Sequence, residues 1–348
     1  MMVASMIGNA QNQVIALQHE GETSFYYDGN PSLGVIVADY ALAGDTIYLP
    51  GGLISTGGFD VNKQLTFVGA GMLNSGTPVT NPTTIAYSFG EDINIQANGN
   101  GSSFHGIDIA RSIRFFGGVT NISFTRCKLS LLSLGVVGFP AATNVHIKHC
   151  VLREGISHSG NAGPQGLWID NCIIAEGINF GQTFISGAYV TQCILLDPDI
   201  IEQENPGVRY TNCIFARTGS YAVNSASSYY NNLFTLSNGG TLTWGTAPTD
   251  GGGNQAYQGN VFVNFGSFSE WNENYDYHLD LTNPENPAWD MGIDDDQVGI
   301  YGGAPGNAWK ENAIPFNPHW QRLLPQDNLG TTNGGVINVT LQGAAQQD

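Results

Sequence analysis

The chain has 348 residues, of which 11% are charged and 46 are glycine, and this composition is typical of a turn-rich β protein rather than a disordered chain. Its 11 Lys and Arg residues stand against 29 Asp and Glu residues, which gives a formal net charge of −18. An acidic surface repels nucleic acids and anionic membranes, so we expect neither as a partner.

The first ten residues of the chain are the first predicted feature. Residues 1–10 resemble the tail of a truncated signal peptide, because an apolar stretch ends in the small residues Gly8 and Ala10, before a plausible mature terminus at Gln11. The alternative is an ordinary unstructured start. We therefore expect a secreted or cell-surface protein, and no later stretch approaches the ~20 apolar residues of a membrane span.

A short helix is predicted next, followed by the first strands. Residues 34–43 carry a helical pattern, and such a helix would plug the first coil of a solenoid and hide its edge. The segment GDTIYLPGG follows at residues 44–52, and we expect the regular coils to start at residues 59–71.

Five cysteines recur at intervals of 23, 22, 21 and 20 residues, at Cys127, Cys150, Cys172, Cys193 and Cys213. Each stands in the same context, such as VHIKHCVL and LWIDNCII, which reads as a strand, a corner and a second strand. One coil of about 20 residues cannot bury its own apolar side chains, so the repeat predicts an all-β parallel β-helix of stacked coils. A leucine-rich repeat is disfavoured because the Leu consensus and the helical segment are missing.

The cysteine position defines the register of the other coils. Ile107, Asn232 and Asn260 are predicted to occupy it in further coils, which makes eight in all. Residues three and five before it, such as Val145 and Ile147, should point inward, and the thiols should be buried and free rather than paired in disulfides. The polar residues just before it should form sharp corners with a left-handed backbone, namely His149, Asn171, Gln192, Asn212 and Asn231.

The pattern of coils stops after residue 305. Segment PFNPHWQRLLP is interpreted as irregular chain, and one alternating strand is expected at Ile337, Val339 and Leu341. The predicted organisation is thus residues 11–305 as one β-helix domain with an N-terminal cap, and residues 306–348 as a C-terminal tail or cap.

The opening GDTIYLPGG, the cysteine corners and the ending NPAWDMG…DQVGIYGG together resemble secreted right-handed parallel β-helix proteins of the pectate-lyase-like superfamily, especially those of Bacteroidetes-type bacteria. The resemblance covers roughly residues 20–305. It implies a right-handed coil but not an activity, since that fold carries lyases, hydrolases, esterases, epimerases and non-enzymes. The family's hydrolase and epimerase motifs are missing, so no catalytic residue is carried over.

An outward column of side chains stands four residues before the cysteine position, at His146, Trp168, Tyr189 and Arg209. Lys148, Asp170, Thr191 and Thr211 flank it two residues later. Outward aromatic rings on an exposed sheet are unusual, and flat rings beside polar atoms suit a glycan, so we expect these residues to line a polysaccharide-binding groove. The alternative is that a loop or the C-terminal tail covers the rings.

A column of acids stands four residues after the cysteine position, at Glu154, Glu176 and Asp197. Stacked coils would place neighbours about 5 Å apart. That spacing suits the two carboxylates of a retaining glycoside hydrolase, or the oxygen ligands of Ca²⁺. The alternative is a set of solvated acids in turns.

Together these columns favour a polysaccharide- or glycan-binding protein with no required cofactor, although calcium is possible. One alternative is a carbohydrate-active hydrolase or lyase that uses Glu154, Glu176 and Asp197. Another is a structural or adhesive surface solenoid. No pattern in the sequence indicates an oligomeric state.

Overall fold

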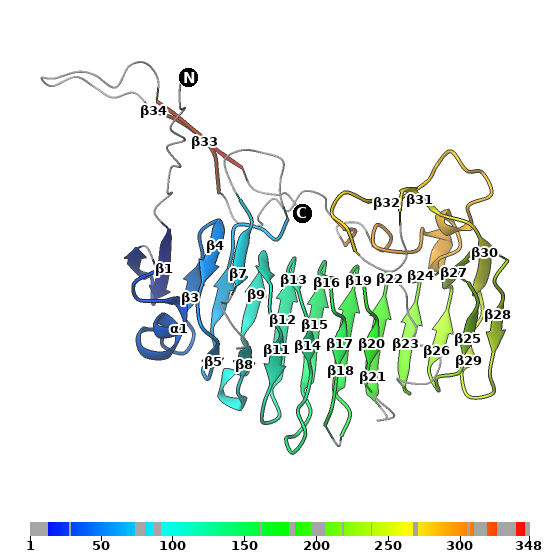
Figure 1. The fold of residues 1–348 in the computed structure, drawn as a ribbon, viewed down its shortest axis with the longest axis horizontal. Coiled ribbons are helices and arrows are strands. Elements are labelled where there is room, and N and C mark those ends of the chain that lie inside the picture. Colours follow the sequence, from blue (N-terminus) through cyan, green and yellow to red (C-terminus); the bar gives the residue numbers. More distant parts are fainter. Residues whose placement is uncertain are drawn as a thin grey trace, which may run out of the picture.

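The fold was obtained as a computed structural model (Figure 1). It describes residues 13–27, 29–73, 81–86, 92–160, 162–180, 185–196, 206–217, 219–237, 239–266, 271–304 and 307–309, and the backbone of 319–325 and 339–344. The protein is a right-handed parallel β-helix of about nine turns, so the predicted fold class is confirmed. The expected signal-peptide tail, residues 1–10, lies outside the described residues.

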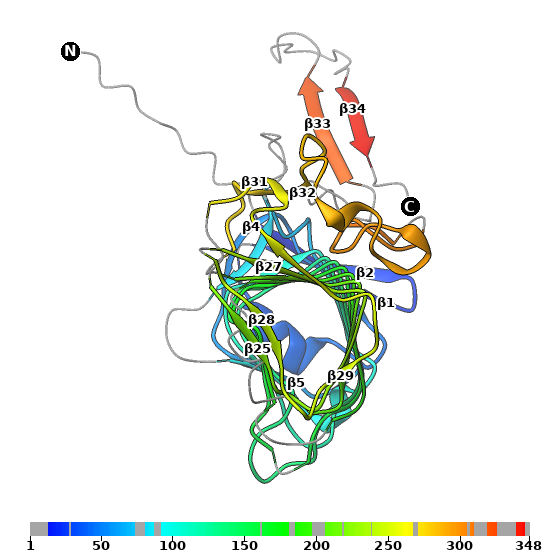
Figure 2. The same cartoon turned by 90° about the vertical axis from the view of Figure 1, so that its right-hand side faces the viewer.

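Three sheets form the sides of the coil, which Figure 2 shows nearly end-on. Sheet A is the longest and contains β2 (Glu22–Tyr27), β1 (Val14–His19), β3 (Thr46–Tyr48), β6 (Thr66–Val68), β9 (Ser103–His105), β12 (Thr120–Thr125), β15 (Thr143–Lys148), β18 (Gln165–Asp170), β21 (Ser186–Thr191), β23 (Val208–Thr211), β26 (Ser228–Tyr230) and β29 (Thr249–Asp250). From β3 onward its neighbours pair in parallel, whereas β1 and β2 add an antiparallel hairpin at its edge.

From β3 onward, each strand of sheet A leads through a corner into sheet B, and most coils then continue into a third side. Sheet B contains β4 (Gly52–Ser55), β7 (Thr83–Ala86), β10 (Ile107–Ile109), β13 (Lys128–Leu129), β16 (Val151–Leu152), β19 (Ile173–Ile174), β22 (Ile194–Leu196), β24 (Ile214–Ala216), β27 (Leu233–Leu236) and β30 (Gln255–Gln258). Sheet C contains β5 (Phe59–Val61), β8 (Ile93–Ile95), β11 (Ile113–Phe115), β14 (Leu132–Ser133), β17 (Ile156–Ser157) and β20 (Ile178–Asn179), and β25 (Tyr221–Val223) pairs with β28 (Leu242–Trp244) in later coils.

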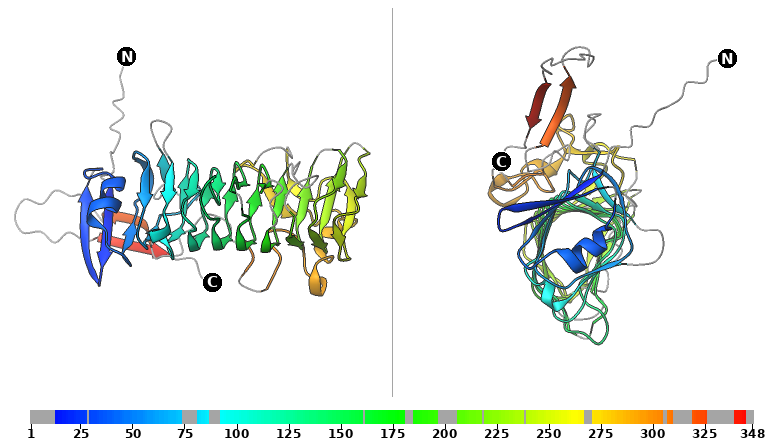
Figure 3. Two further views of the ribbon diagram at one scale, coloured as in Figure 1. Left: turned by 90° about the horizontal axis from the view of Figure 1, so that it is seen from below. Right: turned by 90° about the vertical axis from the view of Figure 1, so that its left-hand side faces the viewer.

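The predicted capping helix is present at the N-terminal end. Helix α1 (Leu33–Val35) continues into a π-helical turn, η1 (Ile36–Tyr40), and Figure 3 shows this element filling the end of the coil. Leu33, Ile36 and Val37 are fully buried there, so apolar side chains rather than an open sheet edge close the interior. The coils begin earlier than predicted, because β3 and β4 already form two sides of the first one.

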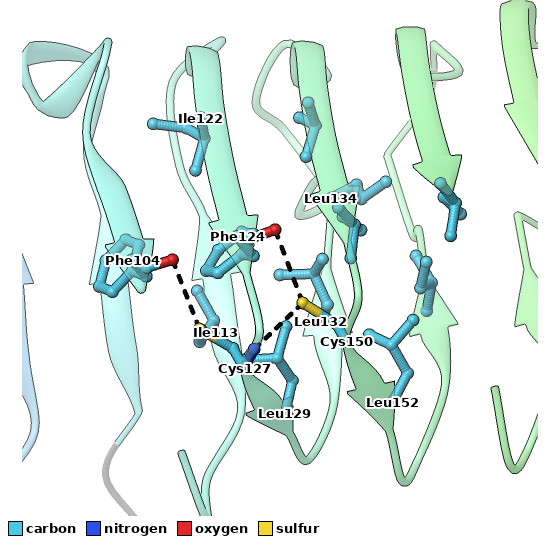
Figure 4. Packing of buried hydrophobic residues seen from close by; sticks show 14 of the residues in the cluster. Phe104, Ile113, Ile122, Phe124, Cys127, Leu129, Leu132, Leu134, Cys150 and Leu152 are labelled. Carbon is cyan, nitrogen blue, oxygen red and sulfur yellow. Dashed lines mark hydrogen bonds between the residues drawn. The ribbon is translucent and has the colours of Figure 1, made fainter. Parts of the chain in front are cut away.

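The five cysteines line the interior as predicted, and all are buried and free. Their sulfurs also accept backbone hydrogen bonds. The backbone amide of Cys127 donates to the Cys150 sulfur at 3.3 Å (Figure 4), and that of Cys150 donates to the Cys172 sulfur at 3.3 Å. Beside them, Phe104 stacks on Phe124 with ring centroids 5.0 Å apart. The interior thus combines close apolar packing with a satisfied corner amide in these coils.

The cysteine position explains one error in the predicted register. The Cys213 amide donates to the Asn232 side-chain oxygen at 2.9 Å, and the Asn232 amide donates to Asn254 at 3.0 Å. Asn254, not Asn260, therefore occupies this position in the following coil, as the pairing of Leu233 with Gln255 also requires. The context of Asn260 imitates the repeat but falls one strand too late.

The corners between sheets A and B have the expected left-handed backbone. His149, Asn171, Gln192, Asn212 and Asn231 all have φ between 48° and 55°. Asparagine adopts this conformation most readily, because its short amide can bond nearby backbone. The side chains of Asn171 and Asn231, however, donate to carbonyl groups of residues 291–302 rather than to neighbouring coils.

The described residues 261–266, 271–304 and 307–309, which we call the covering segment, run back over the outside of the coil. They contain β31 (Phe262–Asn264) and β32 (Asp276–Leu279), which pair antiparallel, and the short helices η4 (Pro287–Trp289) and η5 (Ile293–Asp295). The segment forms a second hydrophobic cluster with the outward side chains of sheet B, such as Ile173 and Ile194. Figure 2 shows it beside the corner of sheets A and B, and the middle strands of sheet B, from β10 to β27, are buried on both faces.

The C-terminal tail contains one more strand than predicted. Strand β34 (Val339–Ala344) includes the expected Val339 and Leu341, whereas Ile337 lies outside the described residues. It pairs antiparallel with β33 (His319–Pro325), which falls in the segment interpreted as irregular chain. The proline at the end of β33 suggested a break, but a strand can end at proline without losing an interior hydrogen bond.

The reactivity of the five thiols tests whether they are buried inside the coil. Burial raises the pKa of Cys127 and Cys193 well above the usual thiol value, whereas at Cys172 burial opposes ionisation but hydrogen bonds with Cys150 and Cys193 lower the pKa to about 6. All five sulfurs are fully buried, so none is accessible to a reagent in the native state. We expect Ellman's reagent to modify no cysteine of the native protein and all five after guanidinium unfolding. Ser186→Cys, at an exposed position of β21, should add one equivalent in the native state. Rapid labelling of the five cysteines in the native protein would contradict their burial in the interior of the coil.

Candidate functional site

The aromatic column predicted from the sequence lies on the outer face of sheet A. Strands β15, β18, β21 and β23 are parallel neighbours, and their register pairs His146 with Trp168, Trp168 with Tyr189, and Tyr189 with Arg209. Alternation along each strand sends the residues on either side inward, and Val145 and Ile147 are buried. We call these four residues the aromatic row.

The rings of the aromatic row stack on one another along the axis of the coil. The His146 and Trp168 centroids lie 6.0 Å apart at an interplanar angle of 11°, and those of Trp168 and Tyr189 lie 4.4 Å apart at 24°. The expectation that the faces are open for a sugar therefore changes. Because neighbouring rings cover the Trp168 ring on both sides, the row presents ring edges rather than open ring faces to the outside.

Three members of the row are exposed and Tyr189 is half-buried. Trp168 has a relative exposure of 40%, and His146 and Arg209 are also exposed. The covering segment reaches only its margin, where the Lys148 ammonium donates to the Asn307 side chain at 2.8 Å. Exposed tryptophan in register with other rings marks a surface for interaction more than a surface for packing.

Polar and charged groups border the row. Thr191 donates a hydrogen bond to the Asp170 carboxylate, and this bond fixes the acid beside Trp168 and Tyr189. At the far end the Arg209 guanidinium lies 4.4 Å from the centroid of Tyr230, a contact that the sequence interpretation missed. Tyr230 pairs with Thr211 in register, so the flanking column continues one coil further than predicted. Thr211 itself is buried.

The acidic column is described in part. Glu154 and Glu176 occupy equivalent positions in successive coils, because the strands before and after them keep one register, and both side chains are exposed. Ser130 donates a hydrogen bond to Glu154. Asp197, the third predicted acid, lies outside the described residues. Catalysis and calcium binding by this column therefore stay predictions.

A buried group of charges on sheet B was missed entirely. The Lys128 ammonium lies 2.7 Å from one Asp108 oxygen, and Arg153 lies 3.3 Å from the other. Burial raises the pKa of Asp108, and the two cations partly oppose that shift. The signal was present, because Asp108 and Lys128 directly follow the cysteine position in consecutive coils where later coils carry Val151 or Ile173.

Searches for metal sites and membrane helices gave no candidate in the part of the chain that the structure describes. No group of three His, Cys, Asp or Glu side chains lies close enough there to hold a metal ion. No helix among the described residues has the length and apolar character to cross a bilayer.

No family model, no curated protein and no solved structure matches the chain.

Proposed function

We propose that this protein is a secreted or cell-surface β-helix that binds a polysaccharide along the aromatic row. The observation that carries the proposal is the stack of the exposed His146 and Trp168 rings with the half-buried Tyr189 ring, in register with Arg209. Strands of a sheet are 4.7–4.9 Å apart, so the row offers one side chain to each successive unit of an extended chain. The relationship to the pectate-lyase-like superfamily belongs to this proposal and rests on the sequence motifs quoted above.

The chemistry of the row favours a glycan over other polymers. Register brings an indole, a phenol, a carboxylate and two cations to neighbouring positions of the sheet, and these side-chain types can all form hydrogen bonds with hydroxyl groups. A polyanion would meet a chain of net charge −18. A flat apolar partner would leave Asp170 and Lys148 without water, which is costly.

A glycan array on wild type, Trp168→Ala and Trp168→Phe tests this function. We expect wild type to bind at least one polysaccharide and Trp168→Ala to bind it at least ~10-fold more weakly, because truncation of a central aromatic anchor costs about 2 kcal/mol. Trp168→Phe should retain part of the affinity. Phe139→Ala serves as the control, since Phe139 is an exposed aromatic residue outside the row.

A reducing-end assay on the same polysaccharides tests the enzymatic alternative. Turnover by wild type that Glu176→Gln abolishes and Trp168→Ala only weakens would show that the acidic column acts as a catalytic site. If wild type neither binds nor cleaves any glycan on the panel, the binding proposal is wrong and a structural role for the solenoid is favoured.

A further inference from the structure

A pocket of about 160 Å³ lies between the outer face of sheet B and the covering segment. Its lining includes the rings of Trp271, Tyr275, Tyr301 and Trp309, together with Ile173 from β19 and the Glu273 carboxylate. The pocket is separate from the aromatic row, because the corner between sheets A and B stands between them. A cavity needs roughly 10–15 Å³ of space for water centres to hold one water molecule, so this pocket admits several waters or one small ligand.

We infer that this pocket is a binding site for a single neutral sugar unit, either a free monosaccharide or the end of a glycan chain. Ligand sites characteristically combine aromatic walls with a few placed polar groups, and this pocket has both. It is also smaller than the ~300–1,000 Å³ of sites for larger ligands, so it suits one ring rather than several. The inference is independent of the proposed function of the row.

The walls of the pocket are held in place by contacts behind them. His278 stacks on Tyr301 with centroids 4.1 Å apart, and His278 is itself bonded to Asp276 at 2.7 Å. Tyr275 packs against Phe265 with centroids 5.5 Å apart. Side chains that are fixed before a ligand arrives lose less entropy when it binds, so these contacts favour recognition.

The charges at the pocket favour a neutral ligand. The Lys128 ammonium lies 5.5 Å from the Trp271 centroid and 3.9 Å from the Glu273 carboxylate, whose side chain is 47% exposed. A cationic ligand would meet Lys128 at the ring it needs, and an anionic one would meet Glu273. Hydroxyl groups avoid both conflicts, because they carry no charge and can donate to the Glu273 carboxylate.

Saturation-transfer NMR with glucose, galactose, mannose and N-acetylglucosamine tests the site, with glucuronate and choline as charged comparators. We expect at least one neutral sugar to bind wild type. Glu273→Gln should weaken it at least ~10-fold, since a hydrogen bond to a charged group contributes about 1.5–3 kcal/mol. Trp271→Ala should also weaken it, and Trp271→Phe should restore part of the affinity.

Trp168→Ala separates this inference from the function of the row, because it should lose the polysaccharide but keep the monosaccharide. Native thiols that stay unreactive will show that each variant is folded. The inference is wrong if no neutral sugar binds, if only glucuronate or choline binds, or if Trp271→Ala and Glu273→Gln both bind like wild type.

Discussion

Lys128→Met is expected to destabilise the protein by about 3 kcal/mol at neutral pH, measured as the free energy of unfolding in urea. Lys128 and Asp108 have side-chain exposures of 9% and 8%, so both charges have lost most of their water. Removal of one partner from a buried pair typically costs 3–5 kcal/mol, because the other charge stays buried without compensation. We expect the lower end because Arg153 still contacts Asp108 at 3.3 Å.

The loss should depend on pH in a defined direction. Burial raises the pKa of Asp108 above the usual 3.8, so the folded state holds the charged carboxylate at a cost that is fully present above the raised pKa. Without Lys128 that pKa rises further. As pH falls through this raised pKa, the Asp108 carboxyl takes up a proton in the folded state. The destabilisation by the buried charge is then lost by the time pH reaches the pKa of the unfolded state. The difference between wild type and Lys128→Met should therefore shrink from pH 7 toward pH 4.

The double variant Asp108→Leu, Lys128→Met is the matched control. Replacement of a whole buried pair by apolar residues is often neutral or stabilising, so this protein should unfold near the urea concentration of wild type. A single variant as stable as wild type, or a deficit that does not change with pH, would show that the pair carries no uncompensated charge. The pair would then contribute no more to stability than an ordinary surface ion pair does.

The fold was predictable because its repeat is local and its side chains alternate. The spacing of Cys127, Cys150 and Cys172 identifies the coils, and period-two alternation then separates Val145 and Ile147 from His146. The same logic failed at Asn260, where a local pattern imitated the repeat. Only the hydrogen bond from the Asn232 amide to Asn254 distinguishes the true position.

The candidate sites were predictable only as columns. Register placed Trp168 beside Tyr189, but the rotation of each side chain decides whether ring faces or edges point outward, and no sequence pattern encodes it. The pocket was not predictable either, because it depends on contacts between segments far apart in the chain. Ile173 and Trp309 line it together although more than a hundred residues separate them.

Asn171 at a corner of the coil bonds to the covering segment, and we expect Asn171→Ala to loosen that segment. The side-chain amide of Asn171 donates to the backbone carbonyls of Ile300 and Gly302, both at 2.9 Å, and this side chain is buried. Alanine removes two hydrogen bonds of about 1 kcal/mol each and adds strain of about 1–2 kcal/mol, because φ is 48°. We expect a loss of about 3 kcal/mol and faster cleavage by protease within residues 283–304.

Asn171→Gly separates the two causes, because glycine adopts a positive φ without strain and yet lacks the amide. It should lose only the contribution of the hydrogen bonds, about 2 kcal/mol, and should expose the covering segment to protease as the alanine variant does. If glycine restores the stability of wild type, backbone strain alone explains the effect of alanine. Asn171 would then be required for the backbone conformation of the corner but not for attachment of the covering segment.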